Sequence, residues 1–253
     1  MLARGLPLAR RFPSASCLLP TEALLPISPS SPSGGPTKKR WSQRGEMQRF
    51  LRVIVRVLLP LLIRLEVVGG ENLPEKGPYI LVTNHLSVFD SPILLAVCPH
   101  RIRAFAAAKH RRNPVYAPLL AMAGSIWVRR GEVDRRALQE ALEALRRGEV
   151  LGMAPEGTRA RGVYALQKGK TGAAYLAARA DVPIVPVGLT GTEKVKQNLP
   201  RLRRTDVQVM IGKPFRLPES GRVRGLKLSE YTDLIMRRIA ALLPEEYRGV
   251  YAE

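Results

Sequence analysis

The sequence has 253 residues and a large positive charge. Lys and Arg total 41 against 21 Asp and Glu, which gives a formal net charge of +20. This balance predicts a polyanionic partner, for which a nucleic acid, an anionic membrane surface and phosphorylated metabolites are all candidates. Hydrophobic residues make up 45% of the chain, enough for a sizeable core, so disorder throughout is excluded. The two cysteines, Cys17 and Cys98, offer no disulfide framework and no zinc site, which indicates a reducing compartment.

Residues 1–46 differ in composition from the rest of the chain. They are rich in Pro, Ser and Arg, nearly free of acidic residues, and show no sustained apolar periodicity. Three interpretations stay open: a targeting peptide, a disordered tail, and an extension upstream of a true start at Met47. Pro7, Arg10 and Pro13 interrupt the apolar core that a secretory signal would need.

Residues 47–68 form a strongly apolar segment that also carries three arginines and Pro60. Three arginines would be costly at the centre of a bilayer. At about 100° per residue, Arg52, Arg56 and Arg64 form one basic stripe on a helix. The apolar residues expected opposite that stripe are Leu51, Ile54, Val55, Leu58 and Leu62. The pattern predicts a helix lying in the membrane interface, with a core-packed helix and a true span as alternatives.

From residue 69 to residue 253 the chain alternates apolar β-type runs with helical stretches. The expected strands are 79–83, 104–108, 125–128, 149–153, 183–189 and 207–211. The clearest expected helices are 134–147, stopped by Gly148, and 229–243, with Ser229 as its cap and Pro244 beyond it. Strands separated by helices predict an α/β fold, in which helices cover both faces of a sheet.

The first candidate site is the segment 83–90, TNHLSVFD, placed where an apolar strand ends and a helix begins. A helix that starts at Ser91 leaves His85 and Asp90 together in the preceding turn. There the carboxylate can hold one imidazole nitrogen and leave the other free as a base near neutral pH. A histidine that merely caps a helix is the structural alternative.

Two further blocks flank short strands. Residues 124–130, GSIWVRR, end in Arg129 and Arg130, and the planar fork of arginine suits phosphate oxygens. An ordinary surface pair is the alternative. Residues 182–188, VPIVPVG, hold two prolines in an apolar run, which predicts an edge strand or a bulge. This block carries no ionisable group and can at most shape a wall.

The remaining block is APEGTR, residues 154–159, which follows an expected strand. Pro, Gly and Thr favour a rigid turn whose backbone N–H groups can face an anion. Glu156 could accept a hydrogen bond from a substrate hydroxyl or orient an arginine. Arg159 could bind a phosphate.

In this order and at these separations, the four blocks resemble those of the glycerolipid acyltransferases, whose best-known members are 1-acylglycerol-3-phosphate acyltransferases. The resemblance runs from about Glu71 to Phe215. It implies an acyltransferase domain over 69–253, built on a mixed, largely parallel sheet covered by helices and preceded by a membrane-binding helical element. It also implies transfer of an acyl group from acyl-CoA or acyl-carrier protein to 1-acylglycerol 3-phosphate, giving phosphatidic acid. Glycerol 3-phosphate and other lyso-lipids stay open as acceptors.

The resemblance also assigns roles to single residues. The catalytic pair would be His85 and Asp90, with His85 removing the proton from the acceptor hydroxyl as it attacks the thioester. The residues assigned to the acceptor are Lys109, Arg130, Glu156, Gly157, Thr158 and Arg159. Two departures bear on pocket shape and substrate choice: Ala154 replaces a usual aromatic residue, and Ala160 a common Ser.

These assignments fix the expected partners. They are an anionic membrane surface, a lysophospholipid acceptor and an acyl donor, with no cofactor, on the cytoplasmic face of a membrane. No cluster of His, Cys and carboxylates has metal-ligand spacing. A nucleic-acid-binding protein is the first rival, disfavoured because only 6% of residues are aromatic. A non-catalytic membrane-binding module is the second, and it predicts no thioester turnover.

Overall fold

The computed structural model describes residues 38–129, 131, 133–159, 162, 164–221 and 223–252, with side chains from residue 45 onward. Most of the segment 1–46, for which three interpretations are open, lies outside these residues. The described part forms one compact unit. Helix α1 begins at Lys38, well before the expected start at Met47.

A seven-stranded sheet organises the domain, in the order β1-β7-β6-β2-β5-β3-β4. Strands β2 to β6 run parallel to one another, whereas β7 is antiparallel to β6 and parallel to β1. The prediction of a mixed, largely parallel sheet is therefore confirmed. The strands are β1 (Ile63–Val68), β2 (Ile80–Thr83), β3 (Ile102–Ala107), β4 (Ile126–Val128), β5 (Val150–Met153), β6 (Ile184–Thr190) and β7 (Thr205–Ile211).

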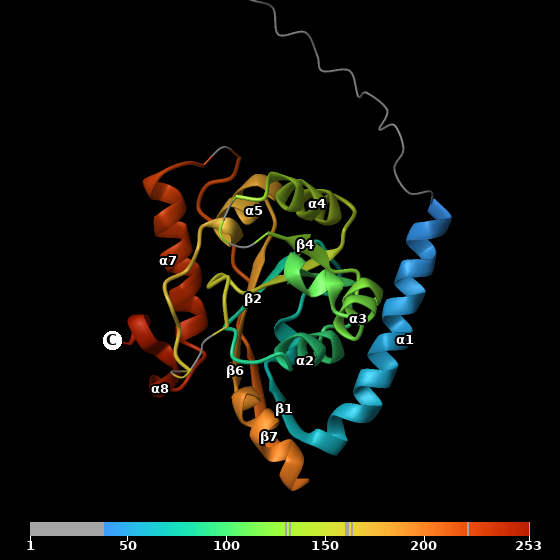
Figure 1. The fold of residues 1–253 in the computed structure, drawn as a ribbon. Coiled ribbons are helices and arrows are strands. Elements are labelled where there is room, and N and C mark those ends of the chain that lie inside the picture. Colours follow the sequence, from blue (N-terminus) through green and yellow to red (C-terminus); the bar gives the residue numbers. More distant parts are fainter. Residues whose placement is uncertain are drawn as a thin grey trace, which may run out of the picture. The chain divides into compact units, whose positions relative to one another are not determined.

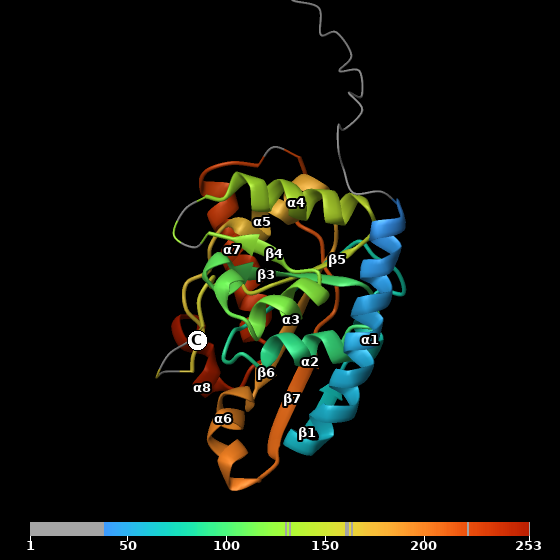
Figure 2. The same ribbon diagram turned by 45° about the vertical axis from the view of Figure 1, so that its right-hand side comes forward.

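Helices cover both faces of this sheet, as Figures 1 and 2 show. On one face α4, α5 and α7 pack against Ile80 and Val82 of β2. On the other face α1 and α2 pack against Tyr79 and Leu81. Alternate side chains of a central strand thus enter two cores. The helices are α1 (Lys38–Leu62), α2 (Asp90–Val97), α3 (Tyr116–Met122), α4 (Arg135–Arg146), α5 (Gly172–Ala180), α6 (Val195–Asn198), α7 (Leu226–Ala240) and α8 (Glu245–Arg248).

The predicted ends are correct for one of the two clearest helices and wrong for the other. Helix α4 has Asp134 as its N-cap, with the carboxylate accepting from the Ala137 N–H, and Gly148 follows with a φ of 76°. The expected start of α7 at Ser229 is wrong. The helix begins at Leu226 after Gly225, because the apolar periodicity extends upstream of the serine.

The prediction of one helix over 47–68 is wrong at its C-terminal end. Helix α1 stops at Leu62, and residues 63–68 form β1, which pairs with β7 along its whole length. Alternating apolar residues in IRLEVV let this segment pair as an edge strand, a signal that the apolar run before it obscured. Among the described residues, no helix combines the length and the apolar character needed to cross a bilayer.

The predicted stripe of three arginines does not form on α1, and two of its members point into the domain. Arg52 is buried and donates to the carbonyls of Leu95, Pro99 and His100. Arg56 donates to the carbonyl of Ala96. The guanidinium groups therefore face the C-terminal end of α2, where helical carbonyls lack intrahelical partners. Arg64 is not part of the helix, and it pairs with Asp206 on β7.

Of the apolar residues expected opposite the arginines, Leu51, Val55 and Leu62 pack against the core, whereas the other part of the apolar surface of α1 points away from the domain. Its exposed residues are Met47, Phe50, Val53, Ile54, Val57, Leu58 and Leu61, spaced by three or four positions. The most exposed of these residues are Val57 at 66% and Leu61 at 64%. Such a continuous exposed apolar stripe is unusual on a monomeric protein and marks an interaction surface.

Strand β6 corrects the prediction of an edge strand for the proline-rich block, whereas the alternative of a bulge is confirmed beside Pro186, where the pairing shifts by one residue between Val187↔Ile211 and Ile184↔Phe215. It lies inside the sheet, between β2 and β7. Pro186 is tolerated because its missing N–H falls on the β7 side, opposite Gly212, where β7 has already ended at Ile211. The ladder between β6 and β7 therefore loses no hydrogen bond within its span.

Candidate active site

The segments that follow the five parallel strands meet at one edge of the sheet. In α/β folds this carboxyl edge is where ligands bind. It brings together polar residues from three of the four sequence blocks and from the segments that follow β3 and β6. The residues concerned are His85 after β2, Lys109 after β3, Arg129 after β4, Glu156 to Arg159 after β5, and Thr192 after β6. Arg130, expected to bind the acceptor phosphate, lies outside the described residues.

The structure brings His85 and Asp90 into direct contact. The Nδ1 atom of His85 lies 2.7 Å from Oδ2 of Asp90, and the two side chains are 19% and 2% exposed. A carboxylate that accepts from Nδ1 leaves Nε2 as the free imidazole nitrogen. The partly exposed ring can therefore offer a base to a bound molecule.

The Asp90 carboxylate is held by four donors. Oδ2 accepts from the His85 ring and from the backbone N–H groups of Leu86 and Ser87, at 2.8 and 2.9 Å. Oδ1 accepts from the hydroxyl of Thr192 at 2.6 Å. Helix α2 begins at Asp90 itself rather than at Ser91, because the carboxylate folds back over the turn and accepts its N–H groups.

Glu156 links the third block to the histidine rather than facing outward. Its side chain is 3% exposed, and its two oxygens accept from the backbone N–H groups of His85 and Gln167, at 3.1 and 3.2 Å. Burial raises the pKa of Glu156 above its usual range. Glu156 was predicted to contact the substrate. In the structure its carboxylate instead accepts from the backbone N–H of His85 and so holds that backbone in place.

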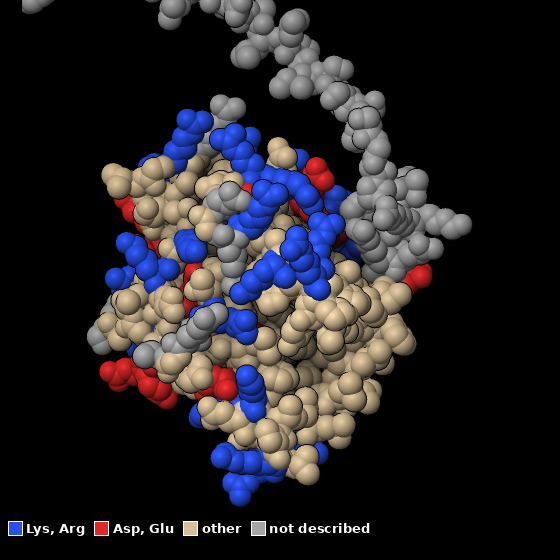
Figure 3. Space-filling view, viewed as in Figure 1, with Lys and Arg blue, Asp and Glu red and all other residues tan. Residues whose placement is uncertain are grey.

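The rest of the Glu-Gly-Thr-Arg turn lies nearer the surface. Gly157 has a φ of 70°, and a Cβ there would lie 3.1 Å from the Lys170 ammonium nitrogen. Thr158 and Lys109 are exposed and Arg159 is half-buried, so all three can meet a ligand from solvent. Figure 3 shows Lys and Arg gathering on this face of the molecule, whereas its part over α1 and α2 carries few charges.

Three residues outside the predicted set support the site. Asn84 bridges β2 to β6, since its side chain accepts from the Leu189 N–H and donates to the Leu189 carbonyl, both at 2.8 Å. The other two are Thr192, whose hydroxyl donates to Asp90, and Lys170, whose side chain lies beside Gly157. The signal for Asn84 is its place beside His85, and Lys170 stands in a Lys-rich stretch after the third block. For Thr192 the sequence offers only a Gly-Thr-Glu turn after an apolar strand.

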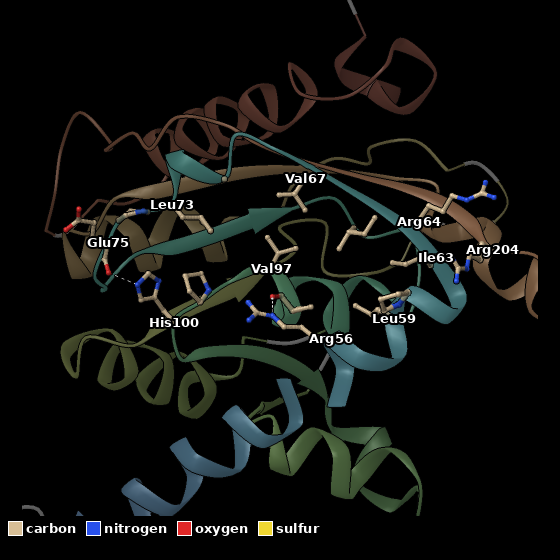
Figure 4. A pocket seen from close by; sticks show the side chains of 16 residues that line it. Arg56, Leu59, Ile63, Arg64, Val67, Leu73, Glu75, Val97, His100 and Arg204 are labelled. Atoms are coloured by element: carbon tan, nitrogen blue, oxygen red, sulfur yellow. Dashed lines mark hydrogen bonds between the residues drawn. The ribbon is translucent and has the colours of Figure 1, made fainter. Parts of the chain in front are cut away.

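A separate groove lies between the C-terminal half of α1, β1 and the end of α2. It encloses about 890 Å³ and is lined mainly by apolar side chains such as Leu59, Ile63 and Val97 (Figure 4). Arg64 and Arg204 stand at one end of it, and His100 at the other. No lining residue belongs to the four sequence blocks. The groove extends the apolar surface of α1 toward the sheet.

A family model described as acyltransferase matches residues 64–190, a span that includes His85, Asp90 and the turn around Glu156. The chain belongs to the acyltransferase family. The resemblance expected from the four blocks is thereby confirmed.

Individual relatives carry more specific names. A 1-acyl-sn-glycerol-3-phosphate acyltransferase from Borreliella burgdorferi is 33% identical over 154 residues, which cover 56% of this chain and 58% of the relative. The Saccharomyces cerevisiae enzyme of the same name is 32% identical, over 55% of this chain and 46% of its own. The alignment thus spans about half the length of these two relatives. The Bacillus subtilis enzyme is 23% identical over 78% of this chain and 96% of its own.

The fold is shared with a solved structure. The crystal structure of the 1-acyl-sn-glycerophosphate acyltransferase PlsC from Thermotoga maritima superposes with a TM-score of 0.62. The match covers 81% of this chain and 82% of that one, at 24% identity. At this identity the likeness establishes the mixed sheet with its flanking helices, and no more than that.

Proposed function

We propose that this protein transfers a fatty acyl group from acyl-CoA or acyl-carrier protein to the free hydroxyl of 1-acylglycerol 3-phosphate, giving phosphatidic acid. The observation that carries the proposal is the contact between His85 and Asp90, at 2.7 Å, at the carboxyl edge of a sheet in an acyltransferase domain. Relatives named for this reaction support the choice of acceptor.

The proposed chemistry needs only a general base and a good leaving group. His85 Nε2 takes the proton from the acceptor hydroxyl while the hydroxyl oxygen attacks the thioester carbonyl carbon. The carbon–sulfur bond then breaks, the new ester forms, and the leaving thiolate takes the proton from His85 Nε2, which restores the neutral base. Asp90 stabilises the imidazolium that exists between these steps. This scheme uses no metal ion and no cofactor.

A panel of acceptors tests the reaction. The purified protein is incubated with acyl-CoA or acyl-carrier protein and, in turn, with lysophosphatidate, glycerol 3-phosphate, a monoacylglycerol and a lyso-ornithine lipid. The last is included because a lyso-ornithine lipid O-acyltransferase from Pseudomonas aeruginosa is 33% identical over 120 residues. We expect the highest kcat/KM with lysophosphatidate. Thiol release that is equal with and without acceptor would contradict the proposal.

We further propose that Arg159, with Lys109 and Arg130, binds the acceptor phosphate. Arg159 follows the turn that Glu156 joins to His85, so its guanidinium starts from a backbone fixed relative to the base. Arg159→Ala should raise KM for lysophosphatidate much more than for monoacylglycerol. Arg159→Lys should recover part of the loss, because an ammonium keeps the charge but not the bidentate fork.

Arg146 supplies the matched control for this experiment. It is an exposed arginine in the last turn of α4, before β5 begins, and belongs to none of the four blocks, so Arg146→Ala should leave both acceptors unaffected. An equal loss toward phosphorylated and uncharged acceptors in Arg159→Ala would show that the arginine is structural or binds the donor.

We also propose that the outer face of α1 holds the protein on an anionic membrane. The face is apolar over 47–61, and the high positive charge of the chain adds attraction to anionic lipids. Because β1 is part of the sheet, a truncation to residue 68 would damage the fold, and point substitutions make the sharper test. Val57→Glu with Leu61→Glu should abolish flotation with vesicles containing phosphatidylglycerol.

Leu226→Glu is the control for the vesicle experiment. Leu226 is 83% exposed at the start of α7, on the opposite side of the domain from α1 (Figure 1). Leu226→Glu adds one negative charge at an exposed apolar position, as Val57→Glu and Leu61→Glu each do. Equal loss of vesicle binding in both proteins would indicate a non-specific effect of net charge and contradict the role of α1.

A further inference from the structure

We infer that Thr192 is a positioning residue for the catalytic pair, and that its hydroxyl fixes the plane of the Asp90 carboxylate and thereby the aim of the His85 ring. The inference rests on the proposed function for the identity of the reaction. It concerns a residue outside the four sequence blocks, brought to the site by β6.

The geometry of the carboxylate gives the reason. Three N–H groups converge on Oδ2 of Asp90, among them the His85 Nδ1–H. A carboxylate held at one oxygen alone can still turn about that point. The Thr192 hydroxyl, 2.6 Å from Oδ1, holds the second oxygen and removes this freedom. A donor to an ionised group is also among the stronger hydrogen bonds in proteins.

The hydroxyl is delivered by a turn that cannot easily adjust. Gly191 adopts a φ of 83°, and a Cβ there would lie 2.1 Å from the Asp206 carbonyl oxygen, so the turn packs tightly on β7. On the other side, Glu193 is buried and accepts from the Tyr247 hydroxyl at 2.8 Å. Thr192 itself is fully buried, which leaves no room for water to replace its hydroxyl.

Thr192→Val and Thr192→Ser separate hydrogen bonding from packing. Valine keeps the shape and removes the donor, whereas serine keeps the donor and removes a methyl group. Thr232→Val is the matched control, because Thr232 is 3% exposed and its hydroxyl donates to the Leu228 carbonyl within α7. Acyl transfer to lysophosphatidate is followed in single turnovers, so that a partly unfolded sample lowers the amplitude and not the rate constant.

We expect Thr192→Val to lower the single-turnover rate constant about 10- to 100-fold, the equivalent of one hydrogen bond to a charged group. KM for the acceptor should change less than about twofold, because Thr192 does not bind the acceptor. Thr192→Ser should transfer at close to the wild-type rate, and so should Thr232→Val. A Thr192→Val rate within about threefold of wild type, or a serine variant as slow as the valine variant, would overturn the inference.

A second measurement does not depend on the reaction. The His85 Nδ1 proton, bonded to a carboxylate, should give a downfield proton NMR signal, assigned among the three histidines by its loss in His85→Ala. The signal should shift or broaden in Thr192→Val and return in Thr192→Ser. If the wild-type protein acylates no acceptor, the proposed function fails and this signal alone decides the role of Thr192. An unchanged signal in Thr192→Val would then refute it.

Discussion

Replacing Asp90 by asparagine tests the catalytic pair with little change of shape. The backbone N–H groups of Leu86 and Ser87 both point at Oδ2, so an asparagine must place its carbonyl oxygen there and its NH₂ group toward Thr192. The Thr192 hydroxyl can turn and accept from that NH₂. The amide oxygen still accepts from His85 Nδ1, so the variant keeps the imidazole tautomer and loses only the negative charge.

The size of the loss follows from that missing charge. Nδ1 and Oδ2 are 2.7 Å apart, which puts the centres of charge of an imidazolium and a carboxylate roughly 4 Å apart. At an effective dielectric constant of about 20, such a pair interacts by about 4 kcal/mol. The carboxylate charge stabilises His85 mainly after His85 has accepted the proton. Losing that charge therefore raises the activation free energy by about this amount. Each 1.36 kcal/mol is a factor of about ten, which predicts a fall of about 10³ in kcat.

Thiol release from acyl-CoA in the presence of lysophosphatidate measures this rate. We expect Asp90→Asn to keep the wild-type melting temperature within a few degrees and to bind vesicles normally. A kcat within about tenfold of wild type would refute a role for the Asp90 charge in the rate-limiting step. A fall beyond about 10⁴ would show that the imidazole has lost its tautomer as well, and that the backbone of Leu86 and Ser87 does not lock the amide.

Three further predictions concern other parts of the site and its support. His85→Ala should lower kcat by about 10² to 10⁴ while circular dichroism and vesicle binding stay unchanged, since the side chain supplies proton transfer rather than packing. Arg52→Ala leaves three carbonyls without their donor and should lower the free energy of unfolding by about 3 kcal/mol in urea titrations, whereas exposed Arg49→Ala should change it by less than about 0.5 kcal/mol. Because burial raises the pKa of Glu156, the folded state favours its protonated form, and the stability of wild type relative to Glu156→Gln should fall as pH rises from about 4 toward neutral. Parallel stability profiles for these two proteins would contradict the assigned burial effect.

The local sequence pattern was enough to predict features that depend only on residues close together in the chain. Apolar runs bounded by turn residues predicted six of the strands, because a strand buried on both faces needs uninterrupted apolar side chains. The contact between His85 and Asp90 was predictable because only four residues of turn separate them at a strand end. Asp134 and Gly148 mark α4 for the same kind of local reason.

The features that the sequence pattern did not predict depend on contacts between residues far apart in the chain. Thr192 is 102 residues from its partner Asp90, and no spacing within the sequence announces that hydroxyl. Glu156 accepts from the backbone of His85, 71 residues away, so the type of residue suggested a substrate contact where the fold has a structural one. Strand β1 pairs only with β7, from the far end of the domain, and so was absorbed into the apolar run before it.

Helix α1 shows why a periodic pattern does not reveal which face of a helix meets the protein. The pattern predicted a basic stripe opposite an apolar one, but the last carbonyls of α2 need donors, and Arg52 and Arg56 supply them from the side that faces the domain. With Arg52 and Arg56 turned inward beside the buried Leu51 and Leu59, the rest of the apolar surface of α1 is left outward, where the proposed membrane contact needs it. Helix α2 is eight residues long, about 12 Å, and begins at Asp90. One short helix therefore joins the arginines of α1 to the carboxylate that orients His85, so the outward apolar face and the catalytic base are held in fixed relation by the same element.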